Sequence, residues 1–168
     1  MREIQRSALV ARSPGRLFDL INDIERYPSF IPWCTHAKVL SRSDHEIVAT
    51  IGVRRGPLHS EFTTRNELEQ HHRIRMHLVA GPFKMLEGEW LLTPIAAGGA
   101  STAAAGHLSG ADPAAARGGS EGSGCRVQLT MKFAFKNPVT AMLFEQKFAE
   151  TAASLMDAFV ARARALPP

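Results

Sequence analysis

The sequence has little of what marks a secreted or membrane-spanning protein. Only Cys34 and Cys125 are cysteines among 168 residues, too few for a disulfide framework, and we interpret both as free thiols in a reducing compartment. No run approaches the roughly 20 consecutive apolar residues that a membrane-spanning helix needs. Residues 1–10 alternate charged with apolar side chains, unlike a signal peptide. We therefore expect a cytoplasmic protein.

A large excess of one charge is also missing, which weakens the case for a nucleic-acid partner. The net charge is +4, with 45% hydrophobic and 21% charged residues, and this composition is typical of one folded domain. Arg54, Arg55, Arg73 and Arg75 form at most a small basic patch without a recognised binding motif. We expect no DNA partner.

Residue clusters that carry out catalysis or bind metals are not evident either. His71 and His72 are neighbours at a predicted turn, and no ligand set forms around them. Cys34 lies two residues before His36, but no known nucleophile motif surrounds it. We predict no catalytic residue, no metal site and no required cofactor, and hence a protein that is not an enzyme.

The pattern of apolar residues predicts an α+β domain built on an antiparallel sheet. A first strand over residues 3–11 is followed by Ser13 and Pro14, a cap and first-turn pair that begins a short helix. The apolar stripe of this helix includes Ile24. From residue 36 the apolar period becomes two, and short connections favour antiparallel hairpins. The further strands are expected at residues 36–42, 45–54, 58–68, 73–79, 85–94 and 126–136, about seven in all.

A long helix is predicted over residues 137–165, because Asn137 caps its start and prolines follow its end. At about 1.5 Å per residue it spans roughly 40 Å, enough to cover the apolar face of the sheet. Its apolar stripe comprises Phe144, Phe148, Ala152, Leu155, Met156 and Phe159.

Residues 96–124 consist mainly of Ala, Gly and Ser with scattered polar residues. Such a segment lacks the apolar side chains that would offset the entropy of ordering it. We interpret it as a disordered loop insertion between the last two strands of a single domain, residues 1–168. The alternative is a linker between two domains.

The positions of the aromatic side chains indicate a ligand-binding site. Tyr27, Phe30 and Pro32 lie in an irregular stretch after the first helix, where they form either a lid over a cavity or a plug at the end of the sheet. Phe83, beside a Gly-Pro turn, is either part of the core or the lip of a cavity mouth. Between the sheet and the long helix we predict an apolar ligand cavity. Its predicted lining is Trp33, Phe62, Met76, Phe83, Trp90, Phe133, Phe148 and Met156.

Four segments carry a resemblance to a known family. Residues 23–34 (DIERYPSFIPWC), 81–86 (GPFKML) with Trp90, 133–137 (FAFKN) and 158–163 (AFVARA) are similar to the coenzyme Q-binding family of the START-like, helix-grip (SRPBCC) superfamily. That family includes bacterial ribosome association toxins and proteins labelled oligoketide cyclases. The resemblance covers nearly the whole chain outside residues 96–124. It implies a curved sheet wrapped round the C-terminal helix, with short helices after the first strand.

The resemblance implies three alternative functions. The first is a non-catalytic carrier that binds ubiquinone or a related polyprenyl lipid and supports respiration, with transient contact at the inner membrane. The second is a toxin that binds a ribosomal subunit and inhibits subunit association. The third is a polyketide cyclase, for which the sequence shows no acid–base pair. We favour the first, because each buried CH₂ group contributes about 0.8 kcal/mol without any exact polar contact.

Overall fold

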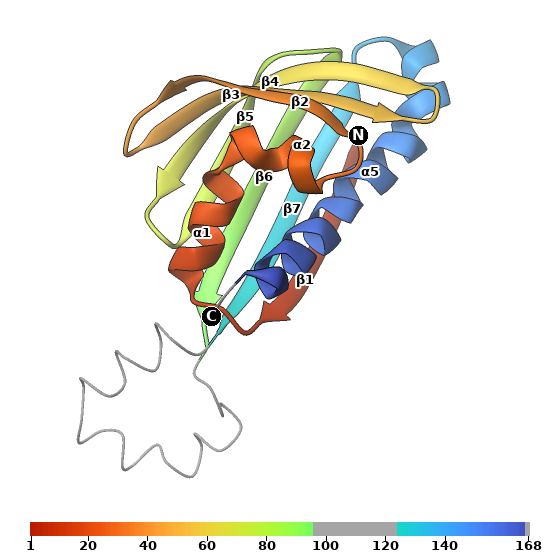
Figure 1. The fold of residues 1–168 in the computed structure, drawn as a ribbon. Helices are drawn as coiled ribbons and strands as arrows, with labels where there is room; N and C mark the ends of the chain where they lie inside the picture. The colour runs from red at the N-terminus through yellow and green to blue at the C-terminus, as the bar shows by residue number, and fades with distance from the viewer. Residues whose placement is uncertain (96–123, 167–168) are drawn as a thin grey trace, which may run out of the picture.

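The computed structural model describes residues 1–95 and 124–166. Its centre is a seven-stranded sheet in the order β1-β7-β6-β5-β4-β3-β2, which curls around helix α5 (Figure 1). The strands are β1 (Arg2–Val10), β2 (Cys34–Arg42), β3 (Glu46–Arg55), β4 (Leu58–Glu69), β5 (Arg73–Ala80), β6 (Phe83–Pro94) and β7 (Cys125–Phe135). The helices are α1 (Pro14–Asn22), the 3₁₀ turn η1 (Ile24–Arg26), α2 (Tyr27–Phe30) and α5 (Pro138–Ala165).

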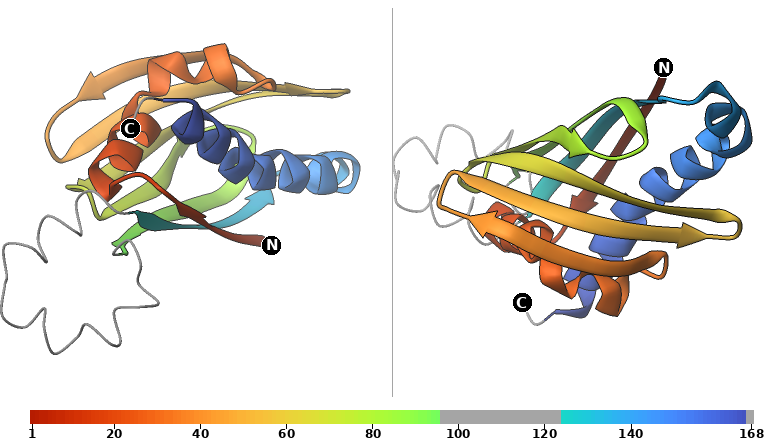
Figure 2. Two further views of the ribbon diagram at one scale, coloured as in Figure 1. Left: turned by 60° about the horizontal axis from the view of Figure 1, so that its bottom comes forward. Right: turned by 90° about the horizontal axis from the view of Figure 1, so that it is seen from above.

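The predicted α+β helix-grip architecture is confirmed. Strands β2 to β7 follow one another as an antiparallel meander, and β1 joins its far edge by pairing antiparallel with β7. Figure 2 shows α5 lying along the concave side of the sheet, with the short helices on the same side. None of the helices in the described part of the chain combines the length and apolarity that crossing a membrane requires.

Strand β7 explains why the sheet needs this cover. Every second residue of β7 is buried, whereas most of the residues between them are partly exposed. The pleat of a strand places alternate side chains on opposite faces, so one face of β7 is apolar and faces α5. The buried set is Cys125, Val127, Leu129, Met131, Phe133 and Phe135.

Both longer helices begin where the sequence predicts. The Ser13 hydroxyl accepts a hydrogen bond from the amide of Arg16 at the start of α1. At the start of α5, the Asn137 side chain accepts from the amides of Val139 and Thr140, at 2.8 and 3.3 Å. These caps satisfy amides that have no partner within the helix.

A few element bounds differ from the prediction. Helix α1 ends at Asn22, so Ile24, expected on its apolar stripe, belongs to η1, although it is still buried. Strands β2 and β6 begin two residues earlier than predicted, at Cys34 and Phe83, because both residues already pair with neighbouring strands.

The predicted insertion at residues 96–124 lies outside the described residues, with the exception of Gly124. The carbonyl of Gly124 accepts a hydrogen bond from the amide of Ile95 at 3.0 Å. Ile95 and Gly124 are therefore held side by side, next to the end of β6 and the start of β7.

Candidate ligand-binding site: an enclosed cavity and an open groove

A small enclosed cavity lies between the sheet and α5. Its volume is about 50 Å³. Four of the predicted ligand-binding residues line it, namely Trp33, Phe62, Met76 and Trp90, and so does Tyr27 of the predicted lid. A water molecule needs roughly 10–15 Å³ of such space, so this cavity has room for a few waters and not for a lipid.

One wall of the cavity is polar, which the sequence analysis missed. Thr64 and Asn66 of β4 are buried, and the Thr64 hydroxyl donates to Oδ1 of Asn66 at 2.9 Å. Both line the cavity beside Phe62. Alternation along β4, counted from Phe62, would have placed these residues on the concave face.

The other four predicted ligand-binding residues do not line this cavity. Phe83, Phe133 and Phe148 pack with Phe62 and Phe135 in an aromatic cluster, with ring centroids between 4.8 and 6.2 Å apart. Met156 is buried in the core. The side chains of this aromatic cluster thus occupy space that we expected a ligand to fill, and the lipid-sized enclosed cavity is absent from the described structure.

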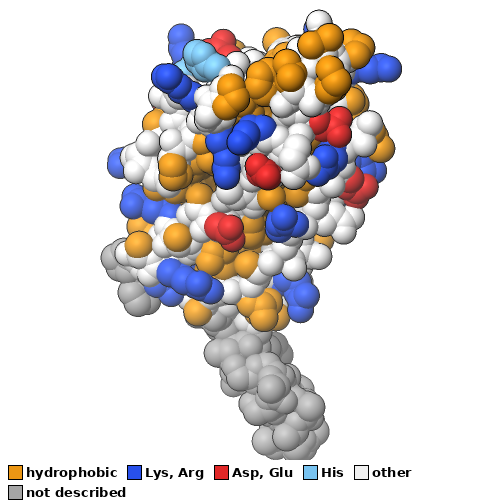
Figure 3. All heavy atoms as spheres, turned by 90° about the vertical axis from the view of Figure 1, so that its right-hand side faces the viewer, with side chains coloured by type: hydrophobic (Ala, Val, Ile, Leu, Met, Phe, Trp, Pro, Cys, Tyr) orange, Lys and Arg blue, Asp and Glu red, His pale blue; other side chains and the backbone are white. Residues whose placement is uncertain are grey.

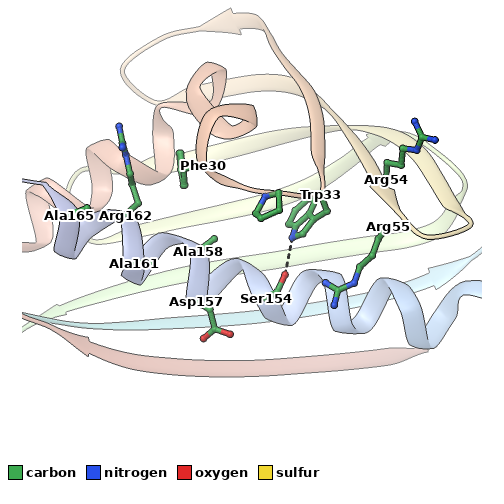
Figure 4. A pocket seen from close by; sticks show the side chains of 11 residues that line it. Phe30, Trp33, Arg54, Arg55, Ser154, Asp157, Ala158, Ala161, Arg162 and Ala165 are labelled. Atoms are coloured by element: carbon green, nitrogen blue, oxygen red, sulfur yellow. Dashed lines mark hydrogen bonds between the residues drawn. The ribbon is translucent and has the colours of Figure 1, made fainter.

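The larger hollow is an open groove of about 820 Å³, which we call the lip groove. It runs between the second half of α5, the α2–β2 connection and the β3–β4 turn (Figure 4). Its apolar surface comes from Phe30, Pro32, Trp33 and the alanines of α5. The full lining is Phe30, Pro32, Trp33, Arg54, Arg55, Ser154, Asp157, Ala158, Ala161, Arg162 and Ala165.

Trp33 separates the groove from the enclosed cavity and lines both. Its indole Nε1 donates to the hydroxyl of Ser154 on α5 at 2.8 Å, drawn as a dashed line in Figure 4. The Ser154 hydroxyl in turn donates to the carbonyl of Thr151 at 2.7 Å. This chain of hydrogen bonds fixes the indole against the helix.

Basic side chains surround the lip groove. The guanidinium of Arg162 lies over the ring of Phe30, 5.5 Å from its centroid, in cation–π geometry. Figure 4 shows Arg55 reaching toward α5 while Arg54 points away from the groove. Asp157 is the one acidic residue in the lining. The groove is therefore apolar on its floor and positively charged at its rim.

The predicted lid residues divide between the two hollows. Phe30 and Pro32 line the groove, and Tyr27 lines the cavity. The Tyr27 hydroxyl donates to the carbonyl of Ile21, and its ring packs on Phe30 and Phe159. Burial raises the pKa of this hydroxyl far above its usual value. Tyr27 is thus a neutral structural anchor, whereas Phe30 and Pro32 form the accessible edge.

The groups that were considered for catalysis do not meet in this site. Burial raises the pKa of the Cys34 thiol to about 11, which disfavours the reactive thiolate at neutral pH. His36 binds Glu61 at 2.6 Å, and both side chains are exposed. Within residues 1–95 and 124–166, no group of three or more His, Cys, Asp or Glu side chains is arranged to hold a metal ion.

Comparison with known proteins gives matches over nearly the whole chain. Residues 10–160 match the family described as "Polyketide cyclase / dehydrase and lipid transport". The "Ribosome association toxin RatA" of Vibrio cholerae is 34% identical over 164 residues, which covers 98% of this chain and 96% of the toxin. A more partial relative is the "Coenzyme Q-binding protein COQ10 homolog B, mitochondrial" of Xenopus laevis, 27% identical over 93 residues, or 55% of this chain and 38% of that protein.

Solved structures share the fold at low sequence identity. A START superfamily protein from Mycobacterium smegmatis superposes with a TM-score of 0.71 at 17% identity, covering 98% of this chain and 99% of that one. An aromatase/cyclase from Streptomyces sp. R1128 gives a TM-score of 0.72 at 14% identity, covering 97% and 93%. These likenesses support the START-like fold alone. The family match over residues 10–160 and the toxin relative show that this chain belongs to the polyketide cyclase / dehydrase and lipid transport family.

Proposed function

We propose that this protein is a non-catalytic carrier that binds an amphipathic polyprenyl lipid of the ubiquinone class in the lip groove. The observation that carries the proposal is the groove itself. Its volume of about 820 Å³ falls in the range of about 300–1,000 Å³ that ligand pockets occupy. Because Trp33 lines both hollows, a ligand in the groove lies next to the apolar interior.

The chemistry of the lining supports such a ligand. Phe30, Ala158 and Ala161 offer apolar surface for an isoprenoid tail. The guanidinium of Arg162 lies over the Phe30 ring at the rim of the groove. Its terminal N–H groups can donate hydrogen bonds to a quinone carbonyl there. The similarity to the Xenopus laevis coenzyme Q-binding protein agrees with this ligand class.

The test is to fill the groove from its floor. Ala161 is exposed and lines the groove, so Ala161→Trp adds bulk there without entering the core. We expect the affinity for a short-tailed ubiquinone analogue to fall at least about tenfold, because excluding two methylene-sized groups already costs about 1.6 kcal/mol. Titration of the analogue against tryptophan fluorescence and native mass spectrometry of the freshly purified protein provide the measurements.

Ala80→Trp is the matched control, since Ala80 is exposed and lies outside the groove lining. It should bind the analogue as the unmodified protein does. Equal binding by all three proteins, or no lipid in the purified protein together with no uptake of added quinone, would rule out the groove as a quinone site.

A second function, association with a ribosomal subunit, is favoured by the similarity to the Vibrio cholerae ribosome association toxin. Arg54 and Arg55 line the lip groove beside the β3–β4 turn. They form no ion pair with any other described residue. Free arginines of this kind bind phosphates, and each contact releases counterions, so binding weakens as salt rises.

The corresponding prediction concerns the salt dependence of binding. The double variant Arg54→Glu/Arg55→Glu should reduce co-sedimentation with ribosomal subunits in sucrose gradients and lower the slope of log affinity against log salt by about two. Arg6→Glu, a charge change on exposed β1, is the control. Ala161→Trp should leave this association intact, which separates it from lipid binding. If adding the wild-type protein at low salt leaves the sucrose-gradient profile of the ribosomal subunits unchanged, the ribosomal function is excluded.

A further inference from the structure

We infer that the outward face of the first turns of α5 docks on an anionic lipid bilayer. The face consists of Val139, Met142 and Leu143, which we call the end patch. These side chains are 57%, 78% and 62% exposed, although all three are large and apolar. Their spacing of three and four residues places them on one side of the helix.

The end patch is distinct from the face of α5 that packs on the core. The opposite side of the same turns packs on the core through Ala141 and Phe144, so the helix already has its buried face. Figure 3 shows hydrophobic side chains gathered at the top of the molecule, where α5 begins. Contiguous exposed apolar side chains of this kind mark an interaction surface, whereas single ones do not.

Charge around the end patch points to an anionic partner. Lys136 immediately precedes the Asn137 cap, and Lys84 lies at the same end of the sheet, because Phe83 and Phe135 are paired. Both lysines are exposed and form no ion pair with another described residue. The first turn of α5 carries no acidic residue that would offset the positive end of the helix dipole.

This combination fits a bilayer better than a second copy of the chain. A stable protein interface needs roughly 800 Å² from each partner, far more than three side chains provide. A two-fold dimer through the end patch would also bring Lys84 and Lys136 of both copies together. At a bilayer, by contrast, apolar side chains enter the acyl boundary while lysines meet lipid phosphates. Docking goes beyond the proposed carrier function and does not rest on which lipid the groove holds.

The experiment is flotation of the full chain with vesicles of equimolar phosphatidylcholine and phosphatidylglycerol, compared with phosphatidylcholine alone. The protein should float with the anionic vesicles and much less with the neutral ones. The double variant Met142→Glu/Leu143→Glu should lower the partition coefficient at least about tenfold, since each buried apolar side chain contributes that much or more. The control Leu9→Glu/Leu40→Glu changes two leucines of similar exposure, 58% and 53%, on the opposite edge strands.

Loss of flotation in the end-patch variant alone, with circular dichroism and groove binding of the ubiquinone analogue unchanged, supports docking. No flotation of the wild-type protein, equal flotation of the end-patch variant, or equal loss in the control overturns it. A concentration-dependent dimer in sedimentation velocity that the end-patch variant abolishes would identify the patch as a self-interface and also overturn it. Failure of quinone binding with intact flotation affects the carrier function alone.

Discussion

Replacing Phe83 with alanine is expected to lower the free energy of unfolding by about 3–5 kcal/mol. Phe83 is fully buried, and its ring lies 4.8 Å from that of Phe135, 5.0 Å from that of Phe148 and 5.7 Å from that of Phe62. These neighbours belong to β7, α5 and β4, so one ring joins three elements. The truncation removes its transfer free energy and leaves a void that packed neighbours cannot close. Urea denaturation followed by circular dichroism measures the loss.

Phe83→Leu is the conservative comparison and should lose only about 1–2 kcal/mol. If Phe83→Ala unfolds at the same urea concentration as the unmodified protein, this aromatic cluster does not hold α5 on the sheet.

The turn that precedes Phe83 constrains the aromatic cluster as well. Gly81 has φ of +148°, and a Cβ there would lie 2.8 Å from Cβ of Phe62, so no other residue fits without displacing the cluster.

Phe159→Ala should have a similar cost, about 3–5 kcal/mol, together with a gain of ligand space. Phe159 is buried, and its ring contacts those of Tyr27, Trp90 and Phe30 at 5.2, 5.3 and 5.6 Å. It also lines the enclosed cavity of about 50 Å³. Removing the ring enlarges this cavity toward the roughly 150 Å³ at which an apolar cavity binds benzene. Benzene should therefore raise the melting temperature of Phe159→Ala.

The unmodified protein serves as the reference for this second prediction, because its cavity is too small for benzene. Its melting temperature should not change with benzene concentration. A destabilised Phe159→Ala protein that also fails to respond to benzene would mean that the surrounding side chains collapse into the vacated space, and that the interior has no capacity to open for a ligand.

Local patterns were enough to predict the antiparallel sheet and its helical cover, whereas the wrapping of the sheet round the C-terminal helix was implied by the family resemblance. The alternation along residues 126–136 and the Asn137-Pro138 start of the long helix are strong signals of short range, and both are confirmed. The limits of the strands were less predictable, because Cys34 and Phe83 become strand residues only through pairing with partners distant in sequence. Alternation shows which face of a strand is apolar, but not how far the strand pairs.

The candidate site was harder to predict, for a related reason. Period two places Phe62 and Phe133 on the concave face, but whether rings on that face enclose a space or fill it depends on the residue opposite. Phe148 of α5 fills that space in the aromatic cluster. Trp33 lies beside the small Ser154 instead, where the groove is open. Such contacts across the core depend on how α5 is shifted along the sheet and rotated about its own axis. A local sequence pattern carries no information about either.

The position of β1 determines when this protein can finish folding during its synthesis. Arg2 pairs with Phe133 and Val10 with Cys125, so the first strand made must wait for the last one to leave the ribosome. Until then β1 has no strand partner, and the growing meander has unpaired edges on both sides. Contacts between such distant parts of a chain form slowly, and the incomplete sheet is prone to aggregate. A nascent chain that stalls before residue 125 should therefore depend on chaperones, whereas a released full-length chain should not.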